Sequence, residues 1–222
     1  RIGYGNEAMP PHNLPFTMVG ASLLWVGWFG FNVGSELAAD GVAGLVLVNT
    51  IAATGAAVLG WLLIESLLSG KATMLGAATG AVAGLVAITP ACGSLGPIGS
   101  IILGFVASII CFWACTSLKK AFGYDDSLDV FGVHGVAGIV GAVGTGILMS
   151  ASFGGVGYGE GVTMGAQTTV QILSVLITIV WSAIVSLILF KLVDAIIGLR
   201  PSEEDERQGL DATSHGESSY NL

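Results

Sequence analysis

Residues 126–149 read DSLDVFGVHGVAGIVGAVGTGILM, a run in which one histidine, His134, is surrounded by apolar residues and glycine. Its apolar part approaches the roughly 20 residues that a bilayer-spanning helix requires. An ionisable side chain in such a helix usually faces the protein interior or a water-filled path, because its transfer into lipid is costly. The run therefore predicts a membrane helix whose imidazole faces the protein interior or a water-filled path.

The composition of the whole chain also indicates a membrane protein. Hydrophobic residues make up 53% of the 222 residues, charged residues only 10%, and the mean hydropathy is +0.84. A soluble domain normally carries about 25% charged residues, so this composition excludes an ordinary soluble fold. The 34 glycines favour helices that pack closely in lipid. A net charge of −8 argues against a nucleic-acid partner.

Six apolar runs, separated by short polar segments, predict an all-α, polytopic membrane protein. Strands of a membrane barrel would instead alternate apolar and polar residues over about ten positions. We expect a transmembrane domain over residues 1–200 and a cytoplasmic tail over 201–222, for which composition alone also allows a disordered, solubilising segment. The expected helices cover approximately residues 14–34, 41–68, 73–90, 97–118, 129–150 and 167–198.

Basic residues fall on one side of this topology. All seven lie in the N-terminal segment, the 69–72 turn, the 119–128 loop and the C-terminal tail, or at an adjoining helix end, whereas the opposite loops contain none. The positive-inside rule therefore predicts that both ends of this segment are cytoplasmic. The chain starts in a polar, proline-rich stretch without an initiator methionine, so we expect it to be part of a longer protein.

Small residues recur at every fourth position in two of the runs. Gly76, Gly80 and Gly84 form one stripe. A second stripe continues from His134 at intervals of four through Gly138, Ala142 and Gly146. Such stripes predict close helix–helix contact and would place His134 on a protein-facing side. The residues alone leave two interpretations open: the imidazole lines a pathway, or it forms a hydrogen bond with a neighbouring helix.

Asp126 and Asp129 precede the histidine with the spacing of a capping box. We therefore expect a structural role at the start of that helix, with ion binding as the alternative. In the first run, Trp28, Phe31 and Ser35 share one helical face. They predict either an interfacial aromatic belt or a site for an ammonium-type cation, which aromatic faces and a hydroxyl oxygen can bind.

The sequence does not predict an enzyme, a catalytic residue, a metal site or a cofactor. His12, His134 and His215 are expected in different compartments, and the chain contains no HExxH, GxSxG or GxxxxGK[ST] motif. The three cysteines lie in or beside apolar runs, so we expect small core residues there and neither a disulfide framework nor a metal site.

Five stretches occur together in one order: WFGFNVGS, GLVAITPACGSLGPIGS, DVFGVHGVAGIVG, GVTMGAQ and EEDERQGLDATSHGESSY. Together they closely resemble the bacterial Amt branch of the Amt/Mep/Rh ammonium transporter family, over essentially the whole chain. Members of that family have eleven transmembrane helices, ten of them in two inverted five-helix repeats. The resemblance implies that this chain corresponds to the last six helices and the tail, with the N-terminal five-helix segment missing.

The resemblance also implies residue roles. His134 corresponds to one of two paired histidines in a narrow hydrophobic pore, and Phe31 to one of two stacked gate phenylalanines. Ser35, together with a tryptophan outside this chain, resembles the external ammonium recruitment site, with Trp28 adjacent. The implied function is transport of ammonium or ammonia, with methylammonium as an analogue, across the bacterial cytoplasmic membrane after external NH4+ recruitment and deprotonation.

The remaining implications concern assembly and regulation. The family resemblance implies a homotrimer in the lipid bilayer, and Asp126 and Asp129 match acidic positions at the inner end of the histidine helix. Alternatives are an ammonium sensor, whose relatives usually carry a longer signalling domain, a Rh-like gas channel, or a non-conducting fragment. The tail resembles the segment that couples subunits and binds the PII nitrogen-regulatory protein, through Gly209, Leu210, Asp211, His215, Gly216 and Glu217.

Overall fold

The computed structural model describes residues 1–218, which form only helices, turns and connecting segments. The all-α prediction is confirmed. Two of the helical stretches contain a wider π turn, Ala114–Leu118 and Phe131–Gly135. The main helices are α1 (Leu14–Asn32), α2 (Gly41–Ser69), α3 (Met74–Ile88), α4 (Pro97–Trp113), α5 (Lys119–Phe122), α6 (Val136–Leu148), α7 (Met164–Ile197) and α8 (Glu203–Gln208).

Internal contacts divide the chain into two compact units. One is Met9–Val175, and the other combines residues 1–8 with residues 176–222. The helix α7 begins in the first unit and continues into the second. The predicted division into residues 1–200 and 201–222 stays a prediction.

Several helices have the length and composition of membrane spans, as a multi-pass membrane protein requires. The third predicted span is shorter than the others, because α3 ends at Ile88 and a turn follows. The fourth is longer than predicted, since α4 continues through its π turn into α5. The five long apolar segments are Leu14–Glu36, Gly41–Ser69, Pro97–Phe122, Phe131–Leu148 and Met164–Ile197.

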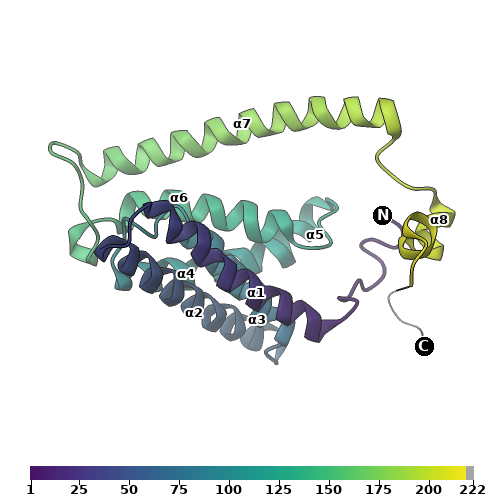
Figure 1. The fold of residues 1–222 in the computed structure, drawn as a ribbon, viewed down its shortest axis with the longest axis horizontal. Helices are drawn as coiled ribbons and strands as arrows, with labels where there is room; N and C mark the ends of the chain where they lie inside the picture. Colours follow the sequence, from purple (N-terminus) through teal and green to yellow (C-terminus); the bar gives the residue numbers. More distant parts are fainter. Residues whose placement is uncertain (219–222) are drawn as a thin grey trace. The chain divides into compact units, whose positions relative to one another are not determined.

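Within the Met9–Val175 unit, α2, α3 and α4 lie side by side (Figure 1). Glycine permits their close approach. A Cβ atom on Gly84 of α3 would lie 2.6 Å from the Ala57 Cβ, and one on Gly104 of α4 would lie 2.1 Å from the Ala53 carbonyl oxygen. The glycine stripe predicted for α3 is therefore confirmed as a helix-packing surface, the usual use of small residues between membrane helices.

A buried asparagine fixes the turn that joins α3 to α4. The Asn49 amide nitrogen of α2 donates to the Cys92 and Leu95 carbonyl oxygens at 2.8 and 2.6 Å. Nearby, the Asn32 amide of α1 donates to the Thr50 hydroxyl at 3.2 Å. The two Asn49 bonds satisfy backbone carbonyl groups inside the helix bundle, which in lipid must find partners within the protein. The three cysteines are free thiols in this buried region.

Candidate functional site

One groove of the Met9–Val175 unit gathers the first turns of α1 and α3 and the turn that carries His134. It encloses about 750 Å³. Asn13 caps α1 by accepting a hydrogen bond from the Phe16 amide at 2.9 Å, and Thr73 caps α3 by accepting one from the Gly76 amide at 2.9 Å. These N-caps fix where the two helices begin. Since Asn13, Leu75 and Asp129 all line the groove, three helix starts meet at this end.

His134 lies in the π turn Phe131–Gly135 and lines the groove with an exposed imidazole. The predicted packing stripe is present at its far end, where a Cβ atom on Gly146 would lie 2.7 Å from the Thr168 Cα, whereas the protein-facing position of His134 stays a prediction. The packed face of α6 contains Gly141, where a Cβ atom would lie 2.2 Å from the Ala87 carbonyl oxygen. A Cβ atom on Gly138 would meet no described atom within 4 Å. Within the described residues the imidazole also has no hydrogen-bond partner, so the His134 side of the helix is open here.

A second histidine lines the same groove. His12 lies directly before the cap of α1 and contributes to the groove wall together with His134. The expectation that the three histidines occupy different compartments stays a prediction, but the structure brings this pair to one groove. Asn13 and the following Pro15 hold the segment with His12 at the start of α1.

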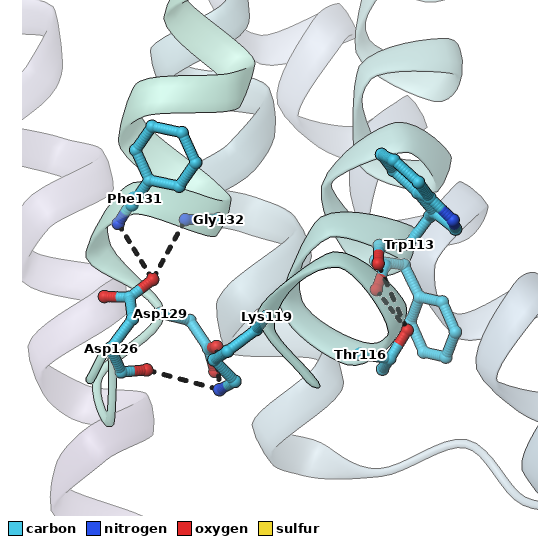
Figure 2. A network of polar contacts seen from close by, with 8 residues as sticks. Trp113, Thr116, Lys119, Asp126, Asp129, Phe131 and Gly132 are labelled. Atoms are coloured by element: carbon cyan, nitrogen blue, oxygen red, sulfur yellow. Dashed lines mark hydrogen bonds and ion pairs between the residues drawn. The ribbon is translucent and has the colours of Figure 1, made fainter. Parts of the chain in front are cut away.

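Asp126 caps the turn that carries the histidine (Figure 2). Its carboxylate oxygen Oδ2 accepts hydrogen bonds from the Phe131 and Gly132 amides, both at 3.1 Å. Only 9% of Asp126 is exposed. The bonds satisfy amide groups that have no partner at a helix start, and they place negative charge at the positive end of the helix dipole.

Lys119 connects this loop to the end of α4 and α5. Its ammonium donates to the Asp126 carbonyl oxygen at 3.2 Å and forms an ion pair with the Asp129 carboxylate. The two partners are partly buried, with side-chain exposures of 23% and 31%. Asp129 also has a positive φ of 54°, a conformation uncommon for residues other than glycine.

The predicted capping box therefore takes a different form. Asp126 bonds amides five and six residues ahead instead of three, because Asp129 turns in the left-handed region and the helix starts with a π turn. The Asp129 carboxylate pairs with Lys119, while the Asp129 amide donates to the Asp126 carbonyl oxygen at 3.1 Å. Sequence reasoning missed Lys119, although a basic residue ten positions before an aspartate across a short loop was an available signal.

The second predicted cluster lies at the other end of α1. The Trp28 and Phe31 ring centroids are 4.8 Å apart at 54°, and the Ser35 hydroxyl donates to the Phe31 carbonyl oxygen. Trp28 is buried, and its indole nitrogen donates to the Thr89 hydroxyl at 2.8 Å. Phe31 is 49% exposed. The structure thus brings these three residues together, while the groove that contains His134 is lined by other residues.

The tail residues through 218 fold into helix α8 and a π turn, Asp211–His215. Gly209 ends α8 with a φ of 99°, and Gly216 follows the π turn with a φ of 67°. The Glu217 amide donates back to the Asp211 carbonyl oxygen at 3.0 Å. The six predicted tail residues, of which Leu210 is partly exposed, therefore lie in one local structure, in contrast to the alternative of a disordered tail.

Glu206 joins this tail to the N-terminal segment of the same unit. Its carboxylate accepts from the Arg200 guanidinium at 2.6 Å and from the Ile2 amide at 3.1 Å. The hydrogen bond from Arg200, followed by that from Ile2, lowers the pKa of Glu206 below its ordinary value of 4.5. The contact is therefore charge-assisted at neutral pH.

A family model, curated relatives and solved structures all match this chain. The family model described as Ammonium Transporter Family matches residues 1–220. The chain belongs to the ammonium transporter family. It is 47% identical over 215 residues to an ammonium transporter of Bacillus subtilis, with 96% of this chain and 53% of the relative covered. It is also 47% identical to an ammonium transporter of Aquifex aeolicus, with 98% and 51% covered.

Solved structures of the family have the same fold. A structure titled Sensor Amt Protein matches with a TM-score of 0.84 and 30% identity, covering 91% of this chain and 49% of that chain. Saccharomyces cerevisiae Mep2 matches with a TM-score of 0.74 and 31% identity, covering 84% and 46%. This ammonium transporter family chain thus spans about half the length of the relatives it matches.

Proposed function

We propose that this chain forms one half of a transmembrane pathway for ammonium or ammonia. One observation carries the proposal: the His134 imidazole is exposed in a mostly apolar groove of a membrane-helix unit. The family match and the curated relatives named ammonium transporters support the choice of substrate. Methylammonium is the analogue to use as a probe.

The chemistry of the groove suits such a substrate. A bare ammonium ion is too strongly hydrated to enter an apolar passage without compensation, whereas neutral ammonia is not. An imidazole titrates near neutral pH and can either accept a hydrogen bond from ammonia or hold the proton that ammonium loses. We therefore assign this role to His134, paired with a second histidine from the preceding half of the full-length protein.

The Phe31 cluster is our candidate for the outer recruitment site. Phe31 presents an exposed ring, and Ser35 lies beside it in a short 3₁₀ turn. Ring faces attract cations, and the serine oxygen keeps a lone pair for an ammonium donor. Because the Trp28 indole N–H already bonds Thr89, we assign Trp28 the task of holding the Phe31 ring in place.

The proposed membrane is the bacterial cytoplasmic membrane, with both ends of this segment in the cytoplasm, because all seven basic residues fall on that side. In the full-length protein, a preceding five-helix segment would face His134. Three such subunits would form a homotrimer with one pathway each. Asp126 and Asp129 would then lie at the inner end of the pathway, where their contacts support a structural role.

The folded tail is the candidate docking segment for a PII-type regulatory protein. Its two glycine-ended turns present acidic and apolar side chains on a short helical structure. Deletion of the tail after Arg200 should abolish co-purification with PII. The Ile177→Ala variant in the exposed part of α7 is the matched control and should retain it. Retained PII binding by the truncated protein would contradict this assignment.

A second candidate function is ammonium sensing. It is favoured by the match to the structure titled Sensor Amt Protein. A sensor would bind ammonium at the Phe31 cluster and transmit the change through the tail, without needing flux past His134. Transport measurements in proteoliposomes separate the two, because a sensor shows ammonium-dependent tail protection and no uptake.

The deciding experiment is His134→Ala in the full-length protein, assayed by methylammonium uptake in proteoliposomes. Loss of uptake, or loss of selectivity for ammonium over potassium, is expected because the imidazole that is proposed to accept the hydrogen bond or the proton disappears. The Ile177→Ala variant should transport normally. Unchanged uptake and selectivity in His134→Ala would refute the pathway assignment.

A further inference from the structure

The turn that carries His134 has its first amides held by a residue outside it. A π turn has wider hydrogen-bonded rings than an α-helix, and isolated π turns occur frequently at functional sites. Here the first amides, those of Phe131 and Gly132, bond the Asp126 carboxylate in the preceding loop. The orientation of the turn therefore depends on where that loop is held.

Lys119 is the residue that holds the loop on its other side. One ammonium bonds the Asp126 backbone oxygen and also pairs with the Asp129 carboxylate, so it contacts both ends of the 126–129 segment (Figure 2). The segment includes Asp129 at its positive φ, which costs conformational energy unless surrounding contacts compensate for it. The ion pair supplies such a contact.

Lys119 is itself placed by a second π turn, Ala114–Leu118, which directly faces the first. A Cβ atom on Gly132 would lie 2.6 Å from the Cys115 sulfur, so the two turns are in close contact. The Thr116 hydroxyl in this turn donates to the Phe112 carbonyl oxygen at 2.8 Å. Figure 2 shows its second contact, to the Trp113 carbonyl oxygen. The ammonium thus projects from a packed surface toward the loop.

An exposed lysine–carboxylate pair on a protein surface contributes little. This pair differs in three respects: both partners are partly buried, the same ammonium also bonds a backbone oxygen, and the loop it holds caps the histidine turn. We propose that Lys119 is a positioning residue for His134, acting through Asp129 and Asp126 on the orientation of the imidazole in the groove. This inference rests on the proposed pathway function of His134.

The test uses Lys119→Met in the full-length protein, with methylammonium uptake measured as a function of pH. The substitution keeps the apolar stem and removes the charge, and we expect a loss on the order of tenfold in uptake, because small misplacements of a reacting group have large effects on rate. The pH profile should also shift, since the imidazole changes its surroundings. Lys119→Arg should recover most of the uptake and the original profile.

Lys120→Met is the matched control, because it removes the same charge from the neighbouring, exposed position. It should leave both rate and pH profile unchanged. If Lys119→Met fails to insert, Asp129→Asn serves instead, since asparagine tolerates a positive φ and keeps the side-chain volume. It should produce the same shift.

A double-mutant cycle identifies the route of the effect. If Lys119 acts through His134, the Lys119→Met/His134→Ala protein should be no slower than His134→Ala alone. Additive losses, or an unshifted pH profile in both Lys119→Met and Asp129→Asn, would overturn the inference. Normal transport by His134→Ala alone would refute the proposed function. This outcome differs from a failure of the Lys119 inference, in which His134→Ala is impaired but the Lys119 variants do not act through it.

Discussion

The Trp28 indole of α1 donates a 2.8 Å hydrogen bond to the Thr89 hydroxyl at the end of α3. This bond ties the helix face that carries Phe31 to a second helix and fixes the tilt of the Trp28 ring beneath the phenylalanine. Recruitment at Phe31 should therefore depend on a residue that does not itself reach the substrate.

The first prediction follows from that bond. Trp28→Phe keeps an aromatic ring and loses the donor, at a cost of about 1 kcal/mol for the hydrogen bond. We expect a several-fold higher half-saturation concentration for methylammonium with a nearly unchanged maximal rate, and Thr89→Val should have the same effect. The Phe31→Ala/Ser35→Ala protein should show a larger increase. Wild-type half-saturation in that double variant would contradict the recruitment assignment.

A second prediction concerns the packing of α4 on α2. Gly104→Ala places a Cβ atom 2.1 Å from the Ala53 carbonyl oxygen, so the helices must separate, with an expected destabilisation of about 1–3 kcal/mol. Gly55→Ala is the control, because a Cβ atom there meets no described atom within 4 Å. Unfolding in increasing SDS should show a lower midpoint for Gly104→Ala only. Equal midpoints for the two variants would contradict the close approach of α4 to α2 at Gly104.

The third prediction addresses the Asp126 cap. Asp126→Ala removes the acceptor for two helix-start amides and should lower stability by about 1 kcal/mol, as for other N-cap losses. Asp125→Ala, one position earlier and exposed, should have a smaller effect. Thermal unfolding in detergent measures both. Asp126→Asn retains one acceptor oxygen, so an intermediate midpoint is expected, and identical midpoints for all three variants would rule out the cap.

The fourth prediction concerns the tail contact and its dependence on pH. Glu206 has a lowered pKa, so its bonds to Arg200 and Ile2 stabilise the folded tail above the unfolded pKa and are lost as the pH falls from about 4.5 through the lower folded value. Hydrogen–deuterium exchange of residues 1–8 and 203–208, corrected for intrinsic rates, should therefore rise in that acidic window.

Two substitutions separate the Glu206 contact from general acid effects. In the Glu206→Gln protein, the amides of residues 1–8 and 203–208 should exchange rapidly at neutral pH, as those of the native protein do in acid. Glu204→Gln should retain protection, because among the described residues the Glu204 carboxylate accepts a hydrogen bond from its helix neighbour Gln208 and not from the N-terminal segment. If Glu206→Gln and the native tail exchange alike at neutral pH, the contact does not hold the tail.

Much of the fold was predictable because lipid imposes a simple rule on sequence. Apolar runs such as 41–68 and 97–118 become helices, since backbone groups in a bilayer must bond within their own segment. The α3 glycines were also readable as a packing stripe. The fold class therefore followed from hydropathy and small-residue spacing.

The details of the candidate site were less predictable, for identifiable reasons. The π turn at His134 adds a residue that no hydrophobic period reveals, and within this chain the imidazole is exposed at a groove while Gly146 of the same predicted stripe packs against Thr168. The pairing of Lys119 with Asp129 crosses a loop whose left-handed residue is an aspartate instead of a glycine. His12 lies at the groove because the neighbouring Asn13 caps α1, so a local cap brings His12 to the same groove as His134, which is distant in the sequence.

The π turn at Phe131–Gly135 has a consequence for how this region tolerates changes in length. It is equivalent to one residue inserted into an α-helix, and one residue advances an α-helix by about 100°. Because the wider turn absorbs the extra residue, a single deletion between Phe131 and Gly135 would return the segment to regular α-helical winding and leave the flanking segments close to their present rotation. The side chains inside the turn, His134 among them, would move instead, so such a deletion should damage transport more than it damages the fold.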